Sequence, residues 1–260
     1  MTKEAPVFHT SFVHGKDLVY LGGKHNIQTK LQNGRVESDE WNIFTLLHKN
    51  GTEFTNFKSS AFQINLNKNM FLVIGGHDEG SSKASSQVIL VDMKEQSVQE
   101  LPSLKHPRTY HSCASVGGKK ILISGGLPNG ISGQNTVIVP TELYDITTGT
   151  SQDLTDPLMT PRFGHSLVRL EESVFVLGGN TVGGLSSSSI EKFDITTGTW
   201  TKFSDSLLST STTGLAVTTL PSSAVGCDLG CQCGVAVTKT ERIIGGQQAE
   251  VFHNFAINPV

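Results

Sequence analysis

The sequence predicts an all-β fold built from repeated antiparallel units, and two observations carry this prediction. Four apolar runs of strand length each end in a glycine doublet, and these doublets recur at a nearly constant spacing. They begin at residues 22, 75, 125 and 178, so the successive steps are 53, 50 and 53 residues. A fixed period of this length is the signature of a repeat architecture. The doublets are Gly22-Gly23, Gly75-Gly76, Gly125-Gly126 and Gly178-Gly179.

The clearest unit runs from Arg162 to Trp200. Apolar runs at Leu167–Leu170 and Val174–Leu177 precede its doublet, and a third strand is expected around Ile190–Ile195. A Thr-Gly turn then leads into Trp200. These features predict an antiparallel unit of four strands, with a polar Gly/Ser loop between the second and the third.

Other residues recur in phase with the doublets. His9, His111 and His165 precede their doublets by 13, 14 and 13 residues. Arg108 and Arg162 each lie three residues before a histidine of this series. Residues at repeated positions are expected to pack the unit rather than to act as isolated catalytic groups.

A second motif recurs downstream of the doublets. F-D-I-T-T-G-T-W at Phe193–Trp200 matches Y-D-I-T-T-G-T-S at Tyr144–Ser151 and V-D-M-K-E-Q-S-V at Val91–Val98. A looser copy, L-H-K-N-G-T-E-F, occupies Leu47–Phe54. The first position stays apolar or aromatic, whereas the last position varies.

The period, the Gly-Gly strand end and the aromatic-to-Trp motif resemble the kelch repeat over about residues 7–220. The resemblance implies a β-propeller in which each repeat forms a four-stranded blade. We expect about four blades and a partial fifth in a domain spanning residues 1–221. Glycine allows a strand to end sharply and a neighbour to pack closely, and Phe193 and Trp200 are expected to fill the wedge between adjacent blades. The expected repeats are about 7–58, 59–107, 108–161 and 162–210, followed by the partial 211–221.

The composition changes after Pro221, where three of the four cysteines occur together. Cys227, Cys231 and Cys233 lie in C-D-L-G-C-Q-C-G-V, without the second ligand pair that a structural zinc site needs. They are therefore predicted to be disulfide partners in an oxidising compartment. Residues 222–242 are expected to form an irregular, cysteine-containing linker.

The end of the sequence is similar to a second family. C-G-V, R-I-I-G-G and an alanine six residues after the first isoleucine resemble the activation junction of trypsin-like (chymotrypsin-family) serine protease zymogens, over about residues 227–257. The resemblance implies cleavage between Arg242 and Ile243, and it makes 243–260 the truncated start of a protease domain. Alternatively, R-I-I-G-G ends a degenerate fifth blade, but its doublet at residue 245 would follow the previous one by 67 residues.

No enzymatic activity is predicted for this chain. It lacks the serine, histidine and aspartate segments of a trypsin-like catalytic domain, so only a longer gene product could be a serine endopeptidase. Kelch-bearing carbohydrate oxidases need a copper site of tyrosines and histidines, which Tyr20, Tyr110 and Tyr144 do not assemble. Neither a cofactor nor a metal ion is expected.

Charge and hydropathy narrow the range of partners. The net charge is −3 and basic residues are scattered, so no nucleic-acid partner is expected. No apolar run approaches the ~20 residues of a membrane span.

The leading hypothesis is a non-catalytic kelch propeller that binds an unknown protein, or a glycan, through its loops. The alternative is the N-terminal fragment of a secreted modular zymogen. The cysteines, the junction and the Asn50-Gly51-Thr52 sequon favour an extracellular location, with the cytoplasm as the alternative. The loops expected to contact the partner are Lys24–Trp41, His77–Gln87, Leu127–Pro140 and Asn180–Ser189.

Overall fold

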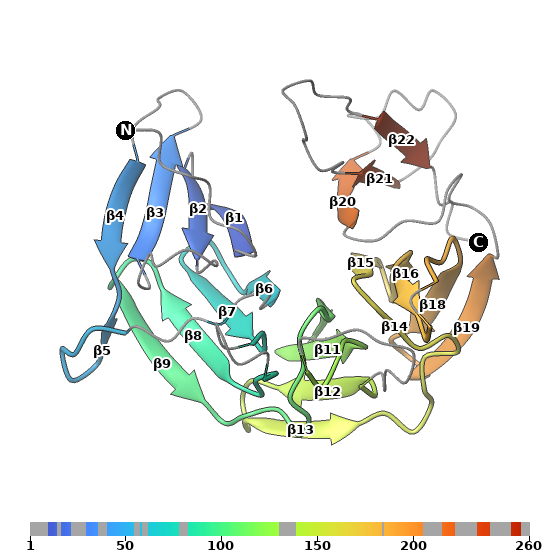
Figure 1. Ribbon diagram of the computed structural model, residues 1–260, viewed down its shortest axis with the longest axis horizontal. Helices are drawn as coiled ribbons and strands as arrows, with labels where there is room; N and C mark the ends of the chain where they lie inside the picture. The colour runs from blue at the N-terminus through green and yellow to red at the C-terminus, as the bar shows by residue number, and fades with distance from the viewer. Residues whose placement is uncertain are drawn as a thin grey trace.

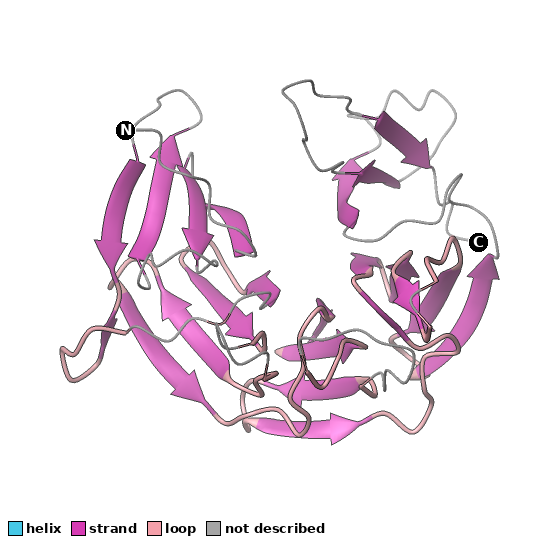
Figure 2. Ribbon diagram, viewed as in Figure 1, coloured by secondary structure: helices cyan, strands magenta, loops and turns pink. Residues whose placement is uncertain are grey.

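The computed structural model consists of strands joined by turns and loops, with no helix in the residues that it describes (Figure 2). Accordingly, no described helix is long and apolar enough to cross a membrane. The described residues are 10–14, 17–21, 30–35, 41–54, 58, 62–77, 83–129, 139–183, 185–204, 215–221, 233–239 and 251–255.

The described strands form six sheets, of which five follow one another along the chain and the sixth is a small two-stranded ladder within blade four. The first four of the five successive sheets each have a core of four antiparallel strands paired in chain order. The first sheet comprises β1 (Thr10–His14), β2 (Asp17–Leu21), β3 (Lys30–Arg35) and β4 (Trp41–Thr45). The second comprises β6 (Phe62–Asn65), β7 (Met70–Ile74), β8 (Val88–Asp92) and β9 (Ser97–Leu101), and β5 (Leu47–His48) is added parallel to β9. The third comprises β10 (Ser112–Gly117), β11 (Lys120–Ser124), β12 (Glu142–Asp145) and β13 (Thr150–Asp153). The fourth comprises β15 (Ser166–Leu170), β16 (Ser173–Leu177), β18 (Ile190–Asp194) and β19 (Thr199–Ser204).

The sheets follow one another around an arc as the blades of a propeller, with β9, β13 and β19 on its outer side (Figure 1). The first strand of each blade contacts the first strand of the next, in the order β1, β6, β10, β15 and β20. This arrangement confirms the predicted all-β propeller of four blades and a partial fifth.

The fifth sheet extends into the segment that was expected to be irregular. Strand β20 (Leu215–Pro221) pairs with β21 (Cys233–Lys239), which in turn pairs with β22 (Val251–Phe255). The sequence C-G-V-A-V-T-K of β21 is rich in β-branched residues, which favour a strand. Strand β21 lies within the range, about residues 227–257, that resembles a protease activation junction. The division of residues 222–260 into a linker and a protease-like segment remains a prediction.

The D-I-T-T-G-T motif forms the turn between the third and fourth strands of a blade. In blade four, Asp194 Oδ1 accepts hydrogen bonds from the backbone N–H groups of Thr196 and Thr197, at 2.8 and 2.9 Å. Gly198 completes the turn with a φ of 72°. The identical motif of blade three makes the same turn, whereas blade two has Gln96 at the glycine position, with a φ of 48°. The aspartate side chain therefore replaces hydrogen bonds that the turning backbone cannot make with itself.

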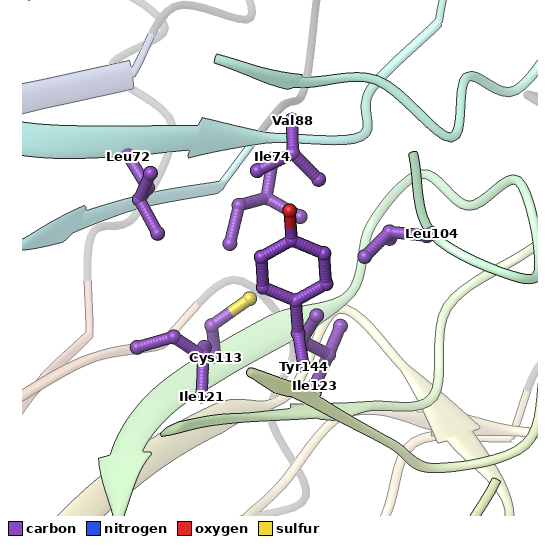
Figure 3. Packing of buried hydrophobic residues seen from close by; sticks show 8 residues of the cluster. All are labelled: Leu72, Ile74, Val88, Leu104, Cys113, Ile121, Ile123 and Tyr144. Atoms are coloured by element: carbon purple, nitrogen blue, oxygen red, sulfur yellow. The ribbon is translucent and has the colours of Figure 1, made fainter. Parts of the chain in front are cut away.

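The core lies between neighbouring blades. The repeated apolar or aromatic position contributes Val91, Tyr144 and Phe193 to three successive clusters of buried side chains. Tyr144 extends from blade three toward Ile74 of blade two, and its hydroxyl donates a 2.8 Å hydrogen bond to the carbonyl oxygen of Pro102 (Figure 3). Burial of each of these side chains is worth on the order of 2 kcal/mol, so the motif that marks the repeat also holds the blades together.

Trp200 belongs to the cluster between blades three and four. It faces Phe193 across β18 and β19, with the ring centroids 5.0 Å apart. The same cluster contains Ala114 and Leu122 from blade three. Phe193 and Trp200 therefore pack between two blades.

Candidate binding surface

The glycine doublet of blade three contacts the repeated histidines of two blades. The first glycine faces the histidine of the next blade: a Cβ added at Gly125 would lie 2.8 Å from His165 Cε1. The second glycine faces its own blade's histidine: a Cβ added at Gly126 would lie 2.8 Å from His111 Cβ. The φ angles of the two glycines are 57° and 91°. A side chain is thus excluded both by the backbone conformation and by the neighbouring blade. The same contacts recur at Gly75 and Gly179.

Blades three and four each contain a buried ion pair beside the doublet. Arg108 pairs with Glu142 and Arg162 with Glu191, and all four side chains are at most 2% exposed. Arg162 Nη2 lies 2.6 Å from Glu191 Oε1, and Arg162 Nη1 donates a 2.9 Å hydrogen bond to the carbonyl oxygen of Gly178. Burial lowers the pKa of both arginines, and the paired glutamates oppose that shift. Each pair ties the segment that enters a blade to that blade's second and third strands.

The arginines recur three residues before the repeated histidines and could be predicted as repeat residues, whereas the glutamates were not predicted. Glu142 and Glu191 each lie three residues before the aspartate of the turn motif, which is a signal that the sequence did contain. Glu191 also accepts hydrogen bonds from the backbone N–H groups of Met159 and Thr160, at 2.8 and 2.9 Å. In blade two the corresponding residue is Ile89, which is 1% exposed. Blade two therefore packs an apolar side chain where blades three and four hold a charge.

The two described histidines of the series, His111 and His165, are each 5% exposed. Burial, followed by the guanidinium groups of Arg162 and Arg108, lowers the pKa of His165 to about 3. Burial, Arg108 and His165 lower the pKa of His111 well below its usual value, against a smaller opposing effect of the Ile74 backbone. Both imidazoles are therefore neutral at physiological pH.

The segments that follow the doublets and the repeated arginines lie together at one end of the blades, which we call the doublet end. Thr109 pairs with Leu127 within blade three. The short strand β14 (Arg162–Phe163) pairs with β17 (Asn180–Thr181) within blade four. An isolated bridge between Lys83 and Asn129 joins the loops of blades two and three. The described residues of the doublet end are 77, 83–85, 109–110, 127–129, 159–164, 180–183 and 185–187.

Tyr110 is an unusual residue at the doublet end. Its φ is 55°, in the left-handed region, whereas the equivalent residue of blade four is Gly164, with a φ of 62°. The half-buried Tyr110 ring lies 6.1 Å from the His77 ring, centroid to centroid. The Tyr110 carbonyl oxygen accepts a 2.8 Å hydrogen bond from the N–H of Gly164. A bulky residue at positive φ is rare because its Cβ crowds the backbone.

The loop between the second and third strands of blade four is a hydrogen-bonded hairpin. The N–H of Thr181 donates to the Leu185 carbonyl oxygen at 2.8 Å, and Ser186 Oγ donates to Asn180 Oδ1 at 2.9 Å. Val182 and Leu185 lie at its tip and are 52% and 72% exposed. The hydrogen-bonded hairpin thus exposes two large apolar side chains to solvent.

One group in the described part of the chain has the side-chain types of a metal site. The ligand atoms of His106, Glu142 and Asp153 lie within 4.8 Å of one another. However, Glu142 already accepts hydrogen bonds from the N–H groups of Lys105 and His106, at 2.9 and 3.1 Å, and from Arg108. The Lys105 ammonium group bonds to Asp153 and would repel a cation. We interpret the group as a structural hydrogen-bond network.

Several residues singled out in the sequence lie outside the described residues, so their assigned roles remain predictions. These residues are Gly22, Gly23, Cys227, Cys231, Arg242 and Ile243. Cys233 begins β21. Cys113 is a buried free thiol. Of the loops expected to bind a partner, Asn180–Ser189 is described except for residue 184, and the others only in part or at their ends.

A four-stranded blade with a closing glycine doublet and a repeated aromatic core position defines a kelch-type propeller. The family described as KLHDC2/KLHL20/DRC7 Kelch-repeats domain matches residues 8–220, so the chain belongs to the kelch-repeat family. Kelch-like protein 25 of Xenopus tropicalis is 30% identical over 139 residues, which are 50% of this chain and 22% of that protein. The chain therefore matches less than a quarter of the length of this relative. Neither comparison supports a protease zymogen junction at residues 227–257.

Proposed function

We propose that this chain is a non-catalytic binding module that recognises a protein partner through the loops of its doublet end. Its membership of the kelch-repeat family supports binding over catalysis, because kelch propellers of Kelch-like proteins are protein-binding modules. The doublet end carries the longest inter-strand loops of the described blades, and loops on a rigid β scaffold are the usual place for recognition.

Tyr110 is the observation that carries this proposal. A left-handed conformation costs a non-glycine residue about 1 kcal/mol, and blade four avoids that cost with Gly164 at the same position. Outside ordinary turns, backbone strain of this kind clusters at ligand-binding and catalytic sites. A half-buried tyrosine also combines a large apolar face with a hydroxyl group, which makes tyrosine one of the residues most enriched at protein interfaces.

Replacing Tyr110 by glycine tests the proposal. The Tyr110→Gly variant should fold, with the free energy of unfolding changed by no more than about 1 kcal/mol, because relief of the strained φ offsets the lost ring contacts. Partner binding should weaken about tenfold, as expected when an aromatic anchor is removed. Proteins captured from cell extract by the immobilised chain are identified, and their affinities for each variant are measured.

Gln96→Gly is the matched control. Gln96 is an exposed turn residue with a φ of 48°, so glycine relieves similar strain away from the doublet end. This variant should bind every captured partner with unchanged affinity. A partner that binds Tyr110→Gly as tightly as it binds the natural chain would show that the doublet end is not the binding surface.

The alternative of a zymogen fragment has no support from the comparisons, and we do not propose it. An extracellular location is a separate proposal that rests on the cluster Cys227, Cys231 and Cys233. Peptide mass analysis of the natural protein without reductant tests it. Free thiols at all three positions would rule it out.

A further inference from the structure

We infer that the blade-four part of the doublet end binds an apolar, uncharged segment of the protein partner. This inference rests on the function proposed above and adds the chemistry of the partner. It is carried by three observations: where the exposed apolar side chains gather, how their backbone is held, and where charge is missing.

The most exposed large apolar side chains of the described residues gather around one small ladder. Met159, Val182 and Leu185 are 56%, 52% and 72% exposed, whereas Leu47 and Phe203 are 39% and 37% exposed. Met159 lies just before β14, and Val182 and Leu185 lie just after β17, its partner strand. We call these three residues the apolar patch. Apolar surface left in water at one place commonly marks a site of protein association.

The backbone beneath the apolar patch is fixed by hydrogen bonds. The antiparallel pairing of Arg162 with Thr181 holds the segment before β14 beside the hairpin after β17. The N–H of Met159 donates to buried Glu191 at 2.8 Å, and the carbonyl oxygen of Leu185 accepts from Thr181. A partner therefore meets apolar side chains on an ordered backbone, so little conformational entropy is lost on binding.

Apart from the half-buried Asp156, whose carboxylate accepts a 2.6 Å hydrogen bond from the N–H of Trp200, the apolar patch has no exposed charge beside it in the chain. Residues 178–190 contain no charged side chain, and the only one in residues 157–163 is Arg162, which is buried against Glu191. In contrast, the corresponding loop sequence of blade two contains Asp78, Glu79 and Lys83, and 17% of the whole chain is charged. A charged partner group placed on the apolar patch would lose its hydration without gaining a counter-ion. The complementary surface is therefore apolar and uncharged.

A random peptide library displayed on phage provides the probe for this inference. The full chain is immobilised, bound peptides are sequenced, and the selected peptides are synthesised for affinity measurements. Selected peptides should be rich in aliphatic and aromatic residues and poor in charged ones. Their affinity should be nearly constant between low and high salt, because no ion pair is formed.

A positively charged and a negatively charged substitution at Leu185 distinguish binding by apolar contact from binding by electrostatic attraction. Leu185→Lys and Leu185→Glu should both fold, since the side chain is exposed, and both should weaken binding about tenfold. Leu47→Ser, which removes a partly exposed apolar side chain from β5, is the matched control and should bind normally. Opposite effects of the lysine and the glutamate variants, or a strong salt dependence, would overturn the inference.

The outcome also distinguishes this inference from the proposed function. If peptides lose affinity for Tyr110→Gly but not for either Leu185 variant, the doublet end binds its partner elsewhere and only the apolar chemistry is wrong. If neither Tyr110→Gly nor the Leu185 variants affect binding, the doublet-end proposal fails as well.

Discussion

Glycine is required in this propeller either by its backbone conformation or by a neighbouring atom that leaves no room for a side chain. The turns between the third and fourth strands of blades three and four provide one example of both reasons together and one of the first alone. Gly149 and Gly198 occupy the same position of the D-I-T-T-G-T motif, with φ values of 67° and 72°. A Cβ at Gly149 would lie 2.5 Å from Pro102 Cγ, whereas a Cβ at Gly198 would meet no atom within 4 Å. Gly149 is thus required by its positive φ and by its contact with Pro102, whereas Gly198 is required only by its positive φ.

Alanine at these two positions should therefore have unequal effects. Gly198→Ala should lower the free energy of unfolding by about 1 kcal/mol, the cost of a left-handed non-glycine residue. Gly149→Ala should lower it by a further 1–3 kcal/mol, roughly the cost of overpacking, because the rigid Pro102 ring must move. Urea unfolding of both variants measures the difference, and equal losses would contradict the role assigned to Pro102.

At the level of the single blade, the buried ion pair is the element that distinguishes blades three and four from blade two. Arg162→Met or Glu191→Ile alone leaves an uncompensated group in the interior, with an expected loss of about 3–5 kcal/mol. The double variant should lose clearly less than the sum of the two, because blade two already packs Ile89 at the glutamate position. Part of the loss should remain, since Glu191 also accepts two backbone N–H groups. Denaturant unfolding of the four proteins gives the coupling energy.

An exposed ion pair provides the control for this measurement. Lys94 and Glu95 lie 3.3 Å apart with side chains 73% and 63% exposed. Glu95→Ala should change the free energy of unfolding by less than about 1 kcal/mol, because water screens the pair. Additive losses for Arg162→Met and Glu191→Ile would mean that the buried residues do not act as a unit.

The blades could be predicted from the sequence because their strands, turns and inter-blade rings recur at a fixed period. The doublet geometry follows from the same periodicity, since Gly125 and His165 must repeat together if they touch. Features that depend on a residue outside the repeated pattern could not be predicted. Tyr110 at a glycine position carries no local signal of its φ, and the exposure of Leu185 depends on hairpin hydrogen bonds. Strand β21 was obscured because C-G-V fits both a strand and a zymogen junction.

For the whole propeller, the histidines at the doublets make blade-to-blade packing sensitive to acid. His111 and His165 each lie between two blades, and their pKa values are lowered by burial and by the nearby guanidinium groups. A histidine of the unfolded chain takes up a proton near pH 6.5, so unfolding below that pH is accompanied by proton uptake at both sites. The stability that the neutral histidines provide is therefore complete above about pH 6.5. It is lost as the pH falls toward the folded-state value of about 3 for His165.

The free energy of unfolding should fall between pH 6.5 and 4.5 by about 1.4 kcal/mol per pH unit for each buried histidine. His165→Phe should flatten this slope by that amount, and blade two shows that the position accepts a phenylalanine, because Phe62 occupies it. The carboxyl groups of Asp153 and Asp194 also have lowered pKa values, but their protonation destabilises the fold only below about pH 4. Urea unfolding measured at intervals of half a pH unit separates the histidine effect, between pH 6.5 and 4.5, from the aspartate effect below about pH 4. An unchanged slope in His165→Phe would mean that the blades separate under acid through other groups.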